Sequence, residues 1–240
     1  SAASDVYKRQ PPPEPRDGNG HGAVRSYGIA RGGIAHDLDP DAVENAPAEP
    51  GTRVAQVAAA FRGVLEALDL DLGDPNLTTT HLRVARAYEE LFAGLREGGE
   101  PTWKSFPNTE GYSQMVSVLD VPFFSLCAHH FLPFFGSAHL GYIPGDQIVG
   151  LSKLARLVDF YARRPQIQER MTEQIVACLN KRLAPKGAMV VIQARHFCME
   201  MRGVSKPGVL TTTSALSGAF EEDRVRQEFL SLVPSRTSLG

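Results

Sequence analysis

Two short segments concentrate side chains that bind transition metals, and this limits how the chain can fold. The first is Cys127-Ala128-His129-His130 and the second is His196-Phe197-Cys198. Zinc is held by thiolate sulfur and imidazole nitrogen, with four protein ligands in a structural site and three plus water in a catalytic one. Five candidate side chains for four positions leave one or two histidines for proton transfer. The fold must bring the two segments together.

The spacing of Cys127 and His130 suits a turn around one ion, and Cys198 would then clamp a second strand region to that turn. The alternative is that both cysteines are ordinary buried thiols and the histidines are core or surface groups. Cys178, alone on an apolar helix face, is interpreted in that second way. With two motifs in a chain of only three cysteines, zinc is favoured.

Composition excludes several classes of protein. The 240 residues suit one domain plus a tail, and 42% hydrophobic and 22% charged residues are typical of a soluble globular protein. A net charge of −2 gives no bias towards nucleic acid or an anionic membrane. No apolar run approaches the roughly 20 residues of a membrane span, and no signal peptide is recognisable. We therefore expect a cytoplasmic protein without nucleic-acid or membrane partners.

The chain divides into three predicted parts. Residues 1–50 contain seven prolines and six glycines but no Phe or Trp, which predicts a flexible tail. Residues 51–107 form a predicted helical section that begins after Thr52, a suitable N-cap. Its apolar residues recur at helical spacing and are predicted to face inward: Val54, Val57, Phe61, Val64, Leu65 and Leu68, then Leu82, Tyr88, Leu91, Phe92 and Leu95.

Residues 108–240 have the pattern of an α+β catalytic domain. Strands are predicted over 115–121, 123–126 and 137–142, followed by helices that start at Gly150 and Pro165. Residues 188–201 are again predicted to be β, and a last helix is predicted over 222–232. The predicted order is ββααββ. Residues two apart on a strand share a face, so we expect His196 and Cys198 to continue the buried row Val190, Ile192 and Ala194.

Cationic and amide side chains indicate a polyanionic small molecule. Ser152 and Lys153 open a helix, whose free N–H groups favour anions, and Arg156 follows one turn later. The alternative is that these cations form a solvated face. Further cations are available at Arg83, Arg86 and Arg202. Gln168 and Glu169 suit the N–H donors of a base such as guanine, although an acid in a first helical turn is also favourable by itself.

The motifs together resemble GTP cyclohydrolase I in unbroken order from about residue 52 to 233. The matching segments are 125–131, 141–144, 150–156, 164–170, 196–198 and 211–214. The resemblance implies the tunnelling fold and a toroidal homodecamer of two stacked pentamers, with active sites between subunits.

The resemblance also implies residue roles. Cys127, His130 and Cys198 match the zinc ligands, and His129 and His196 match the catalytic histidines. The residues that match the family's triphosphate contacts are Ser152, Lys153, Arg156 and Arg202. Arg83 and Arg86 match contacts that a neighbouring subunit supplies. The guanine pocket is matched by Gln168, Glu169 and the backbone of Val149. The implied reaction opens the imidazole ring of GTP at C8, releases formate, and yields 7,8-dihydroneopterin triphosphate for folate or tetrahydropterin synthesis.

Two positions depart from the family pattern. Ala128 stands where a Glu is common, which removes a carboxylate that could orient a metal ligand. His81 stands where a Pro is common, and there we expect a shifted helix start at most. Two other functions stay open: a related cyclohydrolase that stops at ring opening or feeds a deazapurine pathway, and a nucleotide-binding regulatory protein in which zinc is only structural.

Overall fold

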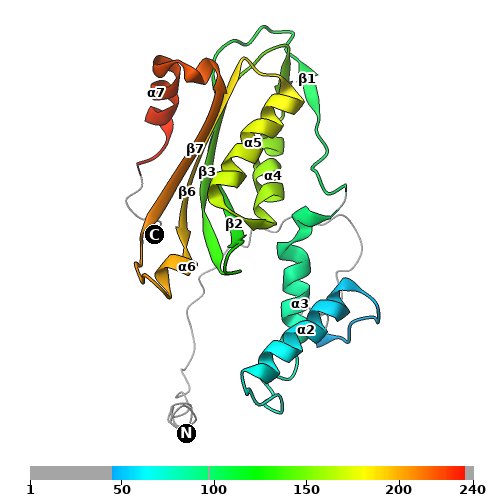
Figure 1. Ribbon diagram of the computed structural model, residues 1–240. Coiled ribbons are helices and arrows are strands. Elements are labelled where there is room, and N and C mark those ends of the chain that lie inside the picture. Colours follow the sequence, from blue (N-terminus) through cyan, green and yellow to red (C-terminus); the bar gives the residue numbers. More distant parts are fainter. Residues whose placement is uncertain (1–44, 97, 236–240) are drawn as a thin grey trace, which may run out of the picture. The chain divides into compact units, whose positions relative to one another are not determined.

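The computed structural model describes residues 45–96 and 98–235, which form a mixed α+β structure (Figure 1). Of the predicted flexible tail, residues 1–44 lie outside the described residues. The helical elements are α2 (Arg53–Ala67), α3 (Thr80–Leu91), η1 (Ala93–Leu95), α4 (Leu151–Ala162), α5 (Gln168–Leu183), α6 (Phe197–Glu200), η2 (Ala219–Glu221) and α7 (Asp223–Leu232). The strands are β1 (Ser105–Pro107), β2 (Val116–Cys127), β3 (Pro133–Ile143), β4 (Gln147–Val149), β5 (Pro165–Gln166), β6 (Gly187–His196) and β7 (Leu210–Gly218).

Five strands form the main sheet in the order β5-β2-β3-β6-β7. The β2–β3, β3–β6 and β6–β7 pairs are antiparallel, whereas β5 runs parallel to β2. β1 and β4 form a separate antiparallel pair. The long elements follow one another as β2, β3, α4, α5, β6 and β7, so the chain returns to the free side of β3 only after both helices.

The inner strand β6, between β3 and β7, is buried on both faces. Val190, Ile192 and Ala194 are fully buried, as predicted, in the cluster that contains the inner residues of α4 and α5. Met189 and Val191 belong to a second cluster, which the C-terminal elements η2 and α7 cover. Burying both rows removes the strand from water and fixes its register, because a shift by one residue would exchange the two faces.

The prediction that Pro165 starts a helix is wrong. Pro165 and Gln166 instead pair with Leu126 and Cys127 at the edge of the sheet, and α5 begins at Gln168. Proline is tolerated at the first residue of an edge strand because it need not donate to the ladder there. This pairing places the start of α5 beside the end of β2.

The prediction that a strand continues to Met201 is also wrong. β6 ends at His196, where its partner Phe134 stands near the start of β3, and Phe197–Glu200 forms one helical turn. Beyond His196, the next residue of β3 is Pro133, which has no N–H to donate, and β7 begins at Leu210, the partner of Arg195. Cys198 therefore reaches its position from a helical turn and not by alternation along a strand.

The helical section contains the two predicted helices, and the side chain of Thr52 caps α2 by accepting a hydrogen bond from the Ala55 N–H at 3.2 Å. The prediction that both apolar stripes are buried is wrong for the single chain. Leu65 is buried, but other stripe members are exposed: Val64 47%, Leu68 64%, Leu91 36% and Leu95 54%.

Among the described residues, no helix combines the length and apolar character that a bilayer crossing requires.

We predict that Gly136→Ala disrupts the pairing of β3 with β6. A Cβ at Gly136 would collide with the Gln193 carbonyl oxygen and lie 2.7 Å from Ala194 Cα. Overpacking of this kind costs about 1–3 kcal/mol or more of unfolding free energy, measurable by urea denaturation. The control is Gly63→Ala in α2, where nothing lies within 4 Å and alanine should add up to about 1 kcal/mol. Equal stability of the two variants would contradict the register.

Candidate metal and nucleotide site

The turn between β2 and β3 brings Cys127 and His130 to one side. The Cys127 carbonyl accepts a hydrogen bond from the Phe131 N–H at 2.8 Å, and the Cys127 N–H donates to Leu132 O at 2.9 Å. Phe131 completes the turn with a left-handed φ of 54°. The turn is tied to β5 through the Ala128 N–H, which donates to Gln166 O at 2.8 Å. As a result, Cys127 Sγ lies 3.9 Å from His130 Nδ1.

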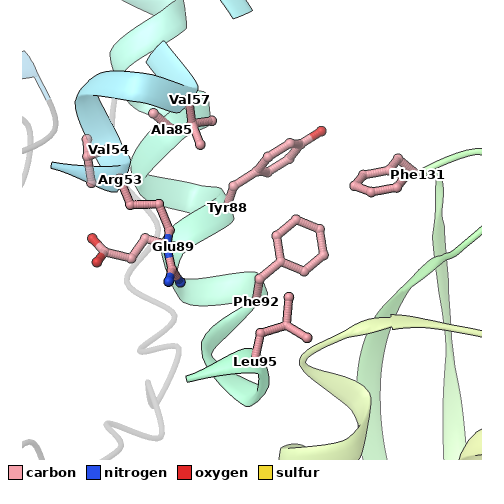
Figure 2. Close-up of a pocket in the computed structure, with 9 residues that line it drawn as sticks. All are labelled: Arg53, Val54, Val57, Ala85, Tyr88, Glu89, Phe92, Leu95 and Phe131. Carbon is pink, nitrogen blue, oxygen red and sulfur yellow. The ribbon is translucent and has the colours of Figure 1, made fainter. Parts of the chain in front are cut away.

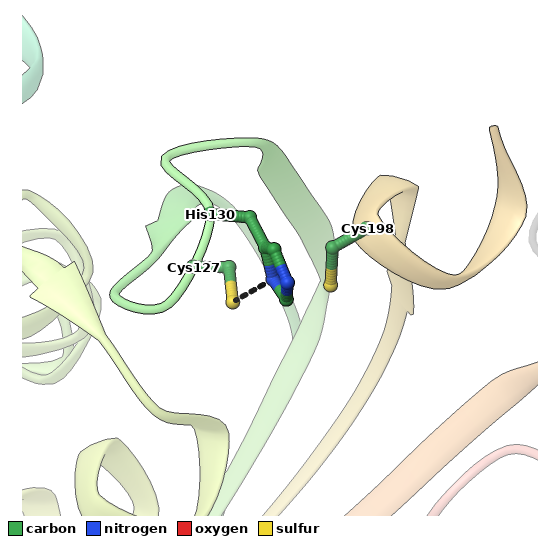
Figure 3. A group of neighbouring side chains, drawn as sticks. All are labelled: Cys127, His130 and Cys198. Atoms are coloured by element: carbon green, nitrogen blue, oxygen red, sulfur yellow. Dashed lines mark hydrogen bonds between the residues drawn. The ribbon is translucent and has the colours of Figure 1, made fainter. Parts of the chain in front are cut away.

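Cys198 approaches this pair from α6 (Figure 3). The ligand atoms of Cys127, His130 and Cys198 all lie within 4.8 Å of one another. They come from segments far apart in sequence, and the pairing of Phe134 with His196 holds those segments together. The structure thus brings together the three residues that the sequence predicted as one ligand set.

This donor set fits zinc. Bonds of about 2.3 Å to sulfur and about 2.0 Å to nitrogen at a tetrahedral angle separate the two ligand atoms by about 3.6 Å. The 3.9 Å between Cys127 Sγ and His130 Nδ1 is close to that value. Burial raises the pKa of the Cys198 thiol, and the adjacent Cys127 raises it further. A divalent cation has the opposite effect, since it stabilises both thiolates.

Two further imidazoles lie beside the ligand set. His129 Nδ1 is 3.7 Å from Cys127 Sγ. The His196 ring stacks on Phe134 with centroids 4.6 Å apart and planes 2° from parallel. Burial lowers the pKa of His196, while the carboxylates of Glu169 and Glu200 oppose that shift. Burial therefore favours the neutral imidazole, which can accept a proton.

These groups share a cavity of about 210 Å³. Its lining consists of Cys127, His129, Gln166, Ile167, Gln168, Glu169, His196, Cys198, Met199 and Thr211. Two thiols, two imidazoles and a carboxylate thus converge on one space. Such convergence of titratable groups in a cavity is typical of an active site.

The other predicted substrate residues lie outside this lining. Ser152 and Arg156 are exposed on α4 and Lys153 is partly exposed, so the cations of this helix face solvent in the single chain. The N–H of Val149 donates to the Tyr142 hydroxyl at 3.4 Å. Their predicted contacts with a nucleotide stay predictions.

The predicted arginines divide into two groups. Arg202 lies at the metal end, where its Nη1 is 3.2 Å from His130 Nε2 and donates to Cys198 O at 3.5 Å. Arg83 and Arg86 on α3 instead donate to Asn45 Oδ1 and Ala46 O. Of these three arginines, Arg202 is therefore the one that stands beside the ligand set within one chain.

A second cavity of about 360 Å³ lies next to the metal turn (Figure 2). Its lining comes from α2, α3, η1 and Phe131, and it is mostly apolar: Arg53, Val54, Val57, Ala85, Tyr88, Glu89, Phe92, Leu95 and Phe131. The rings of Phe92 and Phe131 meet edge to face at 5.7 Å. The turn that carries His130 therefore also contacts the helical section.

Sequence reasoning missed Phe134, which supports one face of His196. In the sequence it is one more apolar residue near a predicted strand, and only the pairing of β3 with β6 gives it this role. The two departures are local: Ala128 offers no carboxylate at the turn, and α3 begins at Thr80, immediately before His81.

We predict that Cys127→Ser and Cys198→Ser each lose stoichiometric zinc, because two ligands hold the ion far less tightly than three. The metal content of dialysed protein, measured by mass spectrometry, checks this. The matched control is Cys178→Ser, since Cys178 is the remaining cysteine and lies outside the ligand group. Full zinc occupancy in both site variants, or equal loss in the control, would contradict the assignment.

Comparison with known proteins agrees with this geometry. Residues 57–234 match the family model of GTP cyclohydrolase I. The curated GTP cyclohydrolase 1 of Porphyromonas gingivalis is 52% identical over 176 residues, which cover 73% of this chain and 91% of that protein. The Mycolicibacterium vanbaalenii protein of the same name is 50% identical over 75% of this chain and 90% of its own length.

A third protein named GTP cyclohydrolase 1, from a Geobacillus species, is 47% identical over 186 residues, 77% of this chain and 98% of its own length. The matched region includes the ligand set, the cavity and the whole main sheet. The chain therefore belongs to the GTP cyclohydrolase I family.

Proposed function

We propose that this chain converts GTP and water to 7,8-dihydroneopterin triphosphate and formate, the first step of folate or tetrahydropterin biosynthesis. The observation that carries the proposal is the cavity on which Cys127, Cys198 and the imidazoles of His129 and His196 converge, with His130 completing the ligand group. Family membership supplies the substrate.

Zinc held by Cys127, His130 and Cys198 supplies Lewis-acid activation of water near neutral pH. Side chains of the protein transfer the protons and bind the guanine. His129 and His196 exchange protons as the guanine imidazole ring opens and the product ring closes. Glu169, which lines the same cavity, accepts hydrogen bonds from the N–H groups of the guanine edge.

The triphosphate requires cations that the cavity lining itself lacks. The proposal assigns this role to Arg202 and to the start of α4, where the free N–H groups of a helix N-terminus favour anions. Cations on that helix add to it, namely Lys153 and Arg156. Arg83 and Arg86 act from a neighbouring subunit.

The proposed assembly is a homodecamer of tunnelling-fold subunits, and its support is the family resemblance together with exposed apolar surface. Val64, Leu68 and Leu95 are 47%, 64% and 54% exposed in the single chain. Apolar residues at helical spacing that face water in one subunit are typical of a surface that another subunit covers. The division of the chain at residues 107 and 108 and a cytoplasmic location stay predictions.

The proposal predicts that zinc-loaded protein given GTP releases formate and forms a pterin that fluoresces after oxidation. Cys127→Ser should form neither product, because the metal is lost, whereas Cys178→Ser should match the wild type. Formate without pterin would indicate a cyclohydrolase that stops at ring opening. If zinc-loaded wild type forms neither product, the proposed activity is wrong and a binding protein with a structural zinc becomes the better account.

A further inference from the structure

The side-chain amide of Gln168 is almost completely buried at the first residue of α5, with 2% of the residue exposed. Its Nε2 lies 3.0 Å from Ile192 O, 3.0 Å from Thr211 O and 3.2 Å from Thr213 Oγ1. Two of these acceptors are backbone carbonyls, which cannot donate. The amide nitrogen must therefore occupy this position, since an oxygen there would face two carbonyl oxygens.

A short chain of hydroxyl groups agrees with this orientation. Thr172 Oγ1 donates to the Gln168 backbone carbonyl at 2.8 Å, so its single proton is already used. Thr172 can then only accept in its 2.7 Å contact with Thr213, which makes Thr213 the donor. Thr213 in turn has only lone pairs left for the Gln168 amide. Every donor among Gln168, Thr172 and Thr213 in this hydrogen-bond network has an acceptor, and the direction of each hydrogen bond is determined.

The amide oxygen of Gln168 is consequently the atom that meets the catalytic imidazole. His196 Nε2 lies 2.7 Å from Gln168 Oε1. An amide oxygen only accepts hydrogen bonds, so Nε2 of His196 must carry a proton. The stacked ring of Phe134 holds the imidazole plane from one side.

We propose that Gln168 is a positioning residue that holds the His196 ring in one orientation, with Nε2–H hydrogen-bonded to the amide oxygen and the ring stacked on Phe134. The inference rests on the proposed function for the catalytic role of His196. It replaces the expected contact of Gln168 with guanine, because both hydrogens of the amide are used within the protein.

The tautomer is measured directly in the zinc-loaded wild type. Two-bond ¹H–¹⁵N correlation of histidine-labelled protein distinguishes the Nε2–H and Nδ1–H forms, and the His196 signals are those lost in His196→Ala. We expect the Nε2–H pattern. The Nδ1–H pattern would overturn the inference, and this result requires no variant of Gln168 to fold.

A double-mutant cycle separates positioning from substrate binding. Gln168→Met should lower kcat for formate release about 10- to 100-fold, part of the 10²–10⁴ that a positioned acid–base group contributes. KM for GTP and zinc content should not change. In a His196→Ala background the same substitution should not lower kcat further, because the imidazole that Gln168 positions is absent. The control is Gln193→Met, a buried glutamine on β6 outside the cavity lining, with wild-type kinetics expected.

Failure of the positioning role of Gln168 and failure of the proposed function give different experimental results. A raised KM in Gln168→Met, or an undiminished effect in the His196→Ala background, would show that Gln168 acts on the substrate and would overturn the inference while the proposed function stands. Wild-type turnover in His196→Ala would instead remove the proposed role of His196. Loss of zinc in Gln168→Met would show a structural role and would also overturn the inference.

Discussion

The antiparallel pairing of β3 with β6 is the interaction on which the site depends. It runs from Ile143 opposite Gly187 to Phe134 opposite His196, and it ends where the ligands begin. β3 carries the metal turn at its start, and β6 carries α6 at its end. A shift of this register by one residue would reverse both buried faces of β6 and move Cys198 away from Cys127.

The same pairing orders the groups around the metal ligands. Phe134 lies under His196 because the two are partners across the strands. The short parallel pairing of β5 with β2 then places Gln168 at the start of α5, where its amide reaches His196. The strand pairing therefore sets where Phe134, His196 and Gln168 lie, and the ring stacking and the amide hydrogen bond then hold the His196 side chain.

The sequence predicted the α+β class, the start of α4 and the end of the last helix, because apolar periodicity is a local signal. It also predicted the grouping of Cys127, His130 and Cys198, because two metal-binding motifs stand out in a chain with three cysteines. It did not locate β7, whose residues Leu210–Gly218 are mostly Thr, Ser and Ala and lack apolar alternation. The start of α5 and the end of β6 were misplaced because strand pairings with residues distant in sequence determine them. The exposed residues of α2 and α3 were predicted to face inward because periodicity shows that one side of a helix is apolar but does not show what covers that side.

The most direct test of this account is X-ray absorption at the zinc edge of the purified, GTP-free protein. We expect two sulfur neighbours at about 2.3 Å, one imidazole nitrogen at about 2.0 Å and one further neighbour from solvent. This pattern would mean that the register of β3 and β6 builds an open, catalytic site from Cys127, His130 and Cys198. Fewer than two sulfur neighbours, or a second imidazole in place of solvent, would contradict it.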